Sequence, residues 1–108
     1  MAKKQDREKI KLIRGLRDKK VRVHLEQYAP VWLVDEDVLP DDEVVRFNVV
    51  FVHPRYGWVN RRYRYDAFND VLYYQGQTRV TEVEALALEE EKPYIDAEAI
   101  NTVNSYGG

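Results

Sequence analysis

The strongest constraint on the fold is a run of alternating apolar and polar residues between Val44 and Tyr74. Alternate residues of a strand point the same way, so one face of the first strand carries Val45, Phe47, Val49 and Phe51. Pro54-Arg55-Tyr56-Gly57 then supplies a turn, since proline presets its backbone and glycine accepts positive φ. Residues 58–65 and 71–74 supply two further strands. The sequence therefore predicts an antiparallel β-meander from Val44 to Tyr74.

The chain before the meander predicts one amphipathic helix and two short strands. Apolar residues recur at a spacing of three over residues 6–18, which is typical of a helix. Asp18-Lys19-Lys20 is interpreted as a break, because apolar and polar residues alternate over 21–26 and favour a half-buried strand. A second apolar strand is expected at 31–34, and the acidic residues 35–43 are expected to form a solvated loop.

The chain after the meander predicts a short fourth strand and a helix. Residues 75–77 are expected to turn, and residues 78–80 to pair briefly with the sheet. The pattern over 81–84 matches a capping box, which predicts a helix over 82–91. The apolar face of that helix would consist of Val83, Leu86 and Ala87. Alternatively, residues 80–83 pair as a strand, and the sequence leaves both structures open.

These elements together predict an α+β fold. It combines an antiparallel β-meander of four to five strands with an N-terminal amphipathic helix and a short C-terminal helical segment packed on the sheet. The 108 residues fit a single domain, with residues 1–5 and 104–108 flexible. Asp96 is expected to cap a last short helix through Ile100 and Val103. The N-terminal helix is expected to pack on the central strand through Ile10, Ile13 and Leu16.

Charge is divided unevenly along the chain. Residues 1–22 hold ten Lys and Arg against three Asp and Glu, whereas the remainder holds seven against sixteen. Such asymmetry indicates either an interaction arm or a basic helix that lies against the chain's own acidic segment. We weigh the two interpretations equally at this stage.

The residues that most enzymes need are scarce. Ser105 is the only serine and there is no cysteine, so nucleophilic acyl transfer has almost no candidate. The five glycines form no phosphate-binding loop, and His24 and His53 fall in different predicted strands. The acidic residues 35–43 lack the spacing of a calcium loop. We therefore expect a non-enzymatic protein with no catalytic residue, no metal site and no cofactor.

Apolar segments in the chain are short. The N-terminus is charged and has no apolar leader, and no apolar run is longer than four residues. We therefore expect a soluble protein without a transmembrane segment, located in the cytoplasm.

The segment 55–65 concentrates arginine and aromatic residues. Trp58, Arg62 and Arg64 would share one surface of the middle strand, with Arg55 and Tyr56 at the adjoining turn. Arg, Tyr and Trp are enriched at interface hot spots, so we predict a protein-binding module such as an accessory subunit or assembly factor. Its partner would present an acidic surface, and homo-oligomerisation stays open. In the structural alternative, Trp58 packs under a helix and the arginines pair with nearby acids.

Binding of RNA or single-stranded DNA is the second functional hypothesis. The basic helix would contact phosphates while Tyr56 or Trp58 stacks on bases. Tyr56-Gly57-Trp58-Val59 resembles part of the central-strand motif of RNA-recognition and cold-shock domains. However, Arg55 and Arg61 stand where that motif has a glycine and a third aromatic residue, and the match falls on a turn. The net negative charge of the chain beyond the basic helix also opposes this hypothesis.

Overall fold

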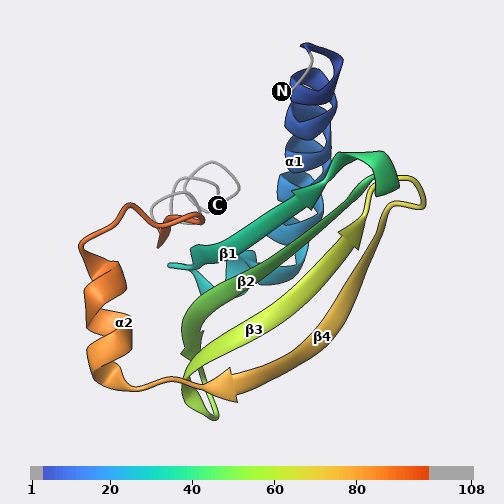
Figure 1. The fold of residues 1–108 in the computed structure, drawn as a ribbon. Helices are drawn as coiled ribbons and strands as arrows, with labels where there is room; N and C mark the ends of the chain where they lie inside the picture. The colour runs from blue at the N-terminus through green and yellow to red at the C-terminus, as the bar shows by residue number, and fades with distance from the viewer. Residues whose placement is uncertain (1–3, 98–108) are drawn as a thin grey trace, which may run out of the picture.

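The computed structural model of the protein describes residues 4–97, and it has an α+β architecture (Figure 1). In chain order the elements are α1 (Lys4–Leu25), η1 (Glu26–Tyr28), β1 (Trp32–Leu39), η2 (Pro40–Asp42), β2 (Val44–His53), β3 (Gly57–Asp66), β4 (Val71–Arg79) and α2 (Glu82–Glu89). The strands form one sheet in the order β1-β2-β3-β4, and every pair is antiparallel. The predicted helix after residue 97 and the predicted flexibility of residues 1–3 and 104–108 lie outside the described residues.

The β-meander is confirmed with the predicted turn between β2 and β3. Val45 pairs with Tyr65 and Phe47 with Tyr63, so the apolar positions of the two strands meet on one face. At the turn, Nδ1 of His53 accepts hydrogen bonds from the backbone N–H groups of Arg55 and Tyr56. Gly57 takes a φ of 75°. This φ lies in the left-handed region, where glycine is favoured because it has no Cβ.

The N-terminal helix is longer than predicted, because α1 continues through the expected break at 18–20 and the expected strand at 21–26. Its buried residues repeat every four positions, which aligns them along one side of a helix: Ile13, Arg17, Val21 and Leu25. Val23, which a strand would bury beside Val21, is 80% exposed. The alternation over 21–26 was therefore misleading, because Val21 and Leu25 satisfy a helical spacing equally well.

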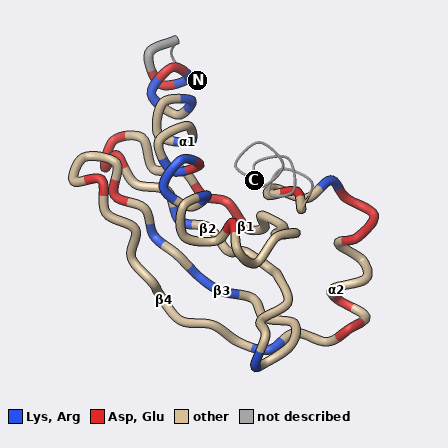
Figure 2. The backbone as a smooth tube through the Cα atoms, turned by 180° about the vertical axis from the view of Figure 1, so that it is seen from behind, with Lys and Arg blue, Asp and Glu red and all other residues tan. Residues whose placement is uncertain are grey.

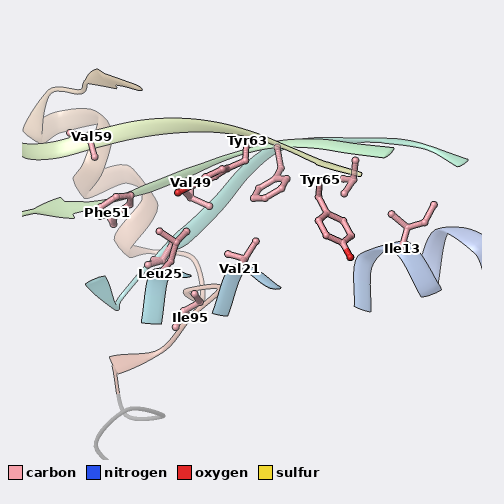
Figure 3. Packing of buried hydrophobic residues seen from close by; sticks show 12 residues of the cluster. Ile13, Val21, Leu25, Val49, Phe51, Val59, Tyr63, Tyr65 and Ile95 are labelled. Atoms are coloured by element: carbon pink, nitrogen blue, oxygen red, sulfur yellow. The ribbon is translucent and has the colours of Figure 1, made fainter. Parts of the chain in front are cut away.

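The core lies between α1 and one face of the sheet (Figure 3). Side chains of β2 and β3 point toward the side chains of α1 and toward Ile95, and the labelled sheet residues are Val49, Phe51, Val59, Tyr63 and Tyr65. Among the predicted helix contacts, Ile13 is buried and Leu16 is partly buried against this cluster. Ile10 is only half-buried and lies outside the cluster.

The two edge strands are longer than predicted. β1 runs through residues 35–39, which were expected to be loop, and a β-bulge between Val34 and Asp37 accommodates the acidic residues. Asp35 takes a φ of 55° at this bulge. β4 likewise continues through the expected turn at 75–77, where Gly76 takes a φ of 107° beside a second irregularity in the register. In both strands a local bulge absorbs the disruptive residues and pairing resumes beyond it.

Residues 82–89 form a helix rather than a strand. Thr81 caps it by accepting a hydrogen bond from the backbone N–H of Glu84. The expected apolar face is wrong, because Val83 and Leu86 are exposed and Ala85 is the buried residue. This short helix stands beside the end of the sheet (Figure 1), so only a narrow side of it faces the protein.

The segment after α2 folds back onto β1. The indole N–H of Trp32 donates a hydrogen bond to the carbonyl oxygen of Glu91 at 3.0 Å. Further along, Ile95 forms an isolated antiparallel bridge with Val31. These contacts cover the start of β1, so the outer edge of that strand is partly shielded.

Within residues 4–97, no helix combines the length and the apolar character that crossing a membrane requires.

The helical structure of residues 21–25 predicts different costs for two similar substitutions. Val21→Ala should lower the free energy of unfolding by about 2 kcal/mol, because Val21 is fully buried. Val23→Ala should change it by no more than about 0.5 kcal/mol, because Val23 is exposed. Chemical denaturation measures both values. Similar losses for the two variants would contradict the helix, since a strand would bury both side chains together.

Candidate functional site

Basic residues of α1 are engaged by acidic residues of the same chain. Glu36 of β1 binds Arg14 and Arg17, and ion pairs also join Lys9 to Glu43 and Lys20 to Asp70. Figure 2 shows acidic segments of the sheet beside the basic helix. Of the two interpretations of the uneven charge, the structure therefore favours a basic helix that lies against its own acidic segment.

Arg17 is the buried member of this network, with only 2% of its surface exposed. Its guanidinium carbon lies 5.0 Å from the ring centroid of Phe47 and 5.5 Å from that of Tyr94. Nη2 donates to Glu36 and Nε donates to Asp18, each at 2.7 Å. The hydroxyl of Tyr94 also donates to Asp18. The sequence pattern predicted no such role for Arg17, because a charged residue on an amphipathic helix is usually exposed to solvent.

The network lowers the pKa of Glu36. Burial alone would raise the pKa of this carboxyl, but hydrogen bonds and positive charge from Arg17 and Arg14 outweigh it and leave the pKa below its ordinary value. Burial also raises the pKa of the Tyr94 hydroxyl, and its hydrogen bond to Asp18 adds to that effect. At neutral pH the Glu36 carboxylate is therefore ionised and accepts hydrogen bonds, while the Tyr94 hydroxyl is protonated and donates one.

A different group of arginines occupies the sheet face opposite α1. Arg46 of β2 is the direct cross-strand partner of Arg64 of β3, and Arg62 is the partner of Asn48. With Asp35 and Gln75 these residues line an open depression of about 300 Å³. We call Arg46, Arg62 and Arg64 the arginine face. Arg62 and Arg64 were predicted site residues, whereas Arg46 was not.

The arginine face is only partly neutralised by the protein itself, because Asp37 of β1 is the cross-strand partner of Arg46 and Asp35 lines the same depression. Among the described side chains, none forms an ion pair or a hydrogen bond with Arg46, Arg62 or Arg64. Nε of Arg64 is buried without a hydrogen-bond acceptor, and its guanidinium lies 4.8 Å from the ring centroid of Tyr73. The charge of Arg64 lowers the pKa of Asp66, but hydrogen bonds from Asn69 lower it more. Like charges directly opposite each other destabilise a sheet, so this arrangement costs stability.

Trp58 lies on the same sheet face as Arg62 and Arg64, while Arg55 and Tyr56 lie at the adjoining turn. Trp58 packs against Trp32, with ring centroids 5.8 Å apart, and its backbone carbonyl accepts a hydrogen bond from Val80. Arg55 and Tyr56 lie at the β2–β3 turn, where the Arg55 guanidinium is 5.7 Å from the Tyr56 ring. Trp58 therefore shares the sheet face of the arginines, where its ring also packs against Trp32 of β1.

Arg61 directly precedes Arg62 in sequence but lies on the α1 side of the sheet. Its guanidinium is near four aromatic rings, those of Tyr28, Phe51, Tyr63 and Tyr74. It also donates hydrogen bonds to Gln77 at 2.9 Å and to the Tyr63 hydroxyl at 3.0 Å. Arg61 is thus satisfied by its own protein, unlike its neighbours on the opposite face.

Comparison with known proteins adds no family or fold relative. No family model matches the chain, and neither any curated protein nor any solved structure is significantly similar to it. The candidate site therefore rests on the geometry of the arginine face.

Replacement by threonine should affect the free energy of unfolding differently at Arg46 and at Arg61. Arg46→Thr should leave the free energy of unfolding unchanged or raise it by up to about 0.5 kcal/mol, because it removes a like-charge pair and threonine suits a strand. Arg61→Thr should lower it by about 1–2 kcal/mol, because hydrogen bonds and ring contacts are lost. Urea denaturation of both variants gives the comparison. A large loss of stability in Arg46→Thr would show that the arginine face is structural.

The lowered pKa of Glu36 predicts a dependence of stability on pH. The pKa is lower in the folded protein than in the unfolded chain, so this stabilisation is complete above the unfolded-state pKa. It is lost as the pH falls through the folded-state pKa. Glu36→Gln should therefore flatten the loss of stability in acid, measured as the free energy of unfolding in a pH series. An unchanged slope would contradict the role assigned to Glu36.

Proposed function

We propose that this chain is a non-enzymatic protein-binding module that presents its arginine face to an acidic surface of a partner. The observation that carries the proposal is the gathering of Arg46, Arg62 and Arg64 on one face, where no described side chain forms an ion pair with them although Asp35 and Asp37 lie nearby. The chain has acids enough to neutralise cations, as the pairs of α1 demonstrate. An arrangement that costs stability and is left uncompensated is characteristic of functional surfaces.

The composition of the surface suits a protein partner. Planar guanidinium groups bind carboxylates through paired hydrogen bonds. Tyr73 extends the surface beneath Arg64 with a ring that is partly exposed. Arginine beside tyrosine is the residue combination found at interface hot spots.

Nucleic-acid binding has less support from the arrangement of charge. That hypothesis needs the basic helix and the arginine-rich strand to form one continuous basic surface. Here α1 covers one face of the sheet and the arginine face is the other, and several cations of α1 are already paired with carboxylates. We therefore retain the acidic protein partner as the proposed ligand.

Paired variants of equal charge test the proposal. Arg46→Gln with Arg62→Gln should reduce capture of an acidic partner from the native source by at least about tenfold, because both bidentate donors are lost. Arg7→Gln with Lys11→Gln removes the same charge from exposed positions of α1 and should leave capture within about twofold. Quantitative affinity purification of the wild-type chain and both variants gives the result.

The outcome separates specific recognition from general charge attraction. Equal losses in the two paired variants would show attraction by net charge alone and would contradict the proposal. A labelled single-stranded oligonucleotide, titrated at low and moderate salt, provides the second comparison. If it bound through Arg46 and Arg62 while no protein was captured, nucleic acid would replace the acidic protein as the proposed partner.

A further inference from the structure

The two edges of the sheet differ in how they are protected against pairing with another strand. β1 carries three consecutive acids, Asp35, Glu36 and Asp37, together with a bulge and the bridge from Ile95. β4 has no charged residue and no proline between positions 71 and 78. Its one protective feature is the irregularity at Gly76. Charges, proline and bulges are the means by which proteins block edge strands, so the β4 edge is the more open to pairing.

Two members of the arginine face extend over β4. A Cβ placed on Gly76 would lie 3.0 Å from Nη2 of Arg62, so the glycine lets this guanidinium lie close against the β4 backbone. The guanidinium of Arg64 lies over the ring of Tyr73, which is also in β4. Both cations therefore stand above the edge strand and within reach of a strand added beside it.

The opposite side of the same edge carries an exposed aromatic ring. Tyr74 points to the α1 side of the sheet, where it is 57% exposed and its ring centroid lies 5.4 Å from the guanidinium carbon of Arg61. Beyond it, Leu16, Val23 and Ala67 line an open groove of about 360 Å³, which Lys19, Lys20, His24 and Asp70 also line. A strand beside β4 would thus meet the guanidinium groups of Arg62 and Arg64 on one face and the Tyr74 ring on the other.

We propose that the partner binds as an extended segment that adds a strand to the β4 edge, with acidic and apolar side chains in alternation. Alternate residues of a strand face opposite sides, so the acids would meet Arg62 and Arg64 while the apolar residues meet Tyr74. Backbone hydrogen bonds to β4 would supply affinity, and the alternation would supply specificity. This inference rests on the proposed function and specifies the form of the ligand.

A second copy of this chain fits the edge less well than an acidic segment. Between positions 71 and 78 its own β4 offers no carboxylate, so it would leave Arg62 and Arg64 without a partner. Pairing of two β4 strands would also bring a second pair of arginines toward the same surface, which adds repulsion. Charge complementarity therefore selects the acidic segment.

Two synthetic peptides of about eight residues test this inference. One alternates Glu with Val and Thr, and the other has the same composition with every Glu at one end. The alternating peptide should bind the full chain at least about tenfold more tightly in fluorescence anisotropy. It should also slow hydrogen exchange of β4 backbone amides, measured by NMR, because amides at the free edge acquire acceptors.

A matched pair of variants at one exposed position of β4 provides the control. Gln75 lines the depression beside the arginines, so Gln75→Glu places a competing carboxylate there and should weaken the alternating peptide about tenfold. Gln75→Lys changes the same position without supplying that carboxylate and should keep the affinity within about twofold. Equal weakening by both variants would overturn the inference, because it would show steric disruption.

The remaining outcomes separate this inference from the proposed function. Equal affinity for both peptides without protection of β4 would overturn strand addition, while a dependence on Arg46 and Arg62 would leave the proposed function standing. Binding of neither peptide would also overturn strand addition, and the capture experiment would then decide the proposed function alone. Protection of β4 that increases with protein concentration in the absence of peptide would overturn it too, because a second copy would occupy the edge.

Discussion

The buried Arg17 network is the interaction on which the rest of the architecture depends. One guanidinium reaches Glu36 of β1, the ring of Phe47 in β2 and the ring of Tyr94 near the end of the described chain. It therefore fixes the position of α1 across the sheet and ties the C-terminal segment to the same point. A buried cation is tolerated only when charged and hydrogen-bonding partners surround it, and Asp18 and Glu36 bind Nε and Nη2 of Arg17, whereas Nη1 is buried without an acceptor among the described residues.

This network also explains how charge is distributed over the two faces of the sheet. Glu36 and Glu43 are used on the α1 side, where they pair with cations of the helix, whereas Asp35 and Asp37 lie on the arginine side. On that side Arg46, Arg62 and Arg64 form no ion pair with any described side chain. Several basic residues of α1 are thus paired with carboxylates of the same protein, whereas those of the arginine face lie on an open surface.

Much of the fold followed from sequence patterns, and the failures have physical causes. The β-meander was predictable because both faces of β2 and the turn before Gly57 obey local rules. The strand expected at 21–26 was wrong because Arg17 interrupts the apolar stripe that would have shown the helix continuing to Leu25. The acidic part of β1 was missed because backbone pairing with β2 outweighs the low strand propensity of Asp and Glu. For the candidate site, alternation placed Arg62 and Arg64 together but could not show that Arg46 lies opposite them.

The sequence by itself determined the α+β class, the central antiparallel strands and the side of the middle strand on which Arg62 and Arg64 lie. These features depend on periodicity and turn chemistry, which act between near neighbours in the chain. Only the tertiary structure decided that Arg17 is buried, that Trp58 packs on Trp32 and that Arg46 completes the arginine face. Strand register and the choice of ion-pair partner join residues that are distant in sequence, so no local pattern specifies them.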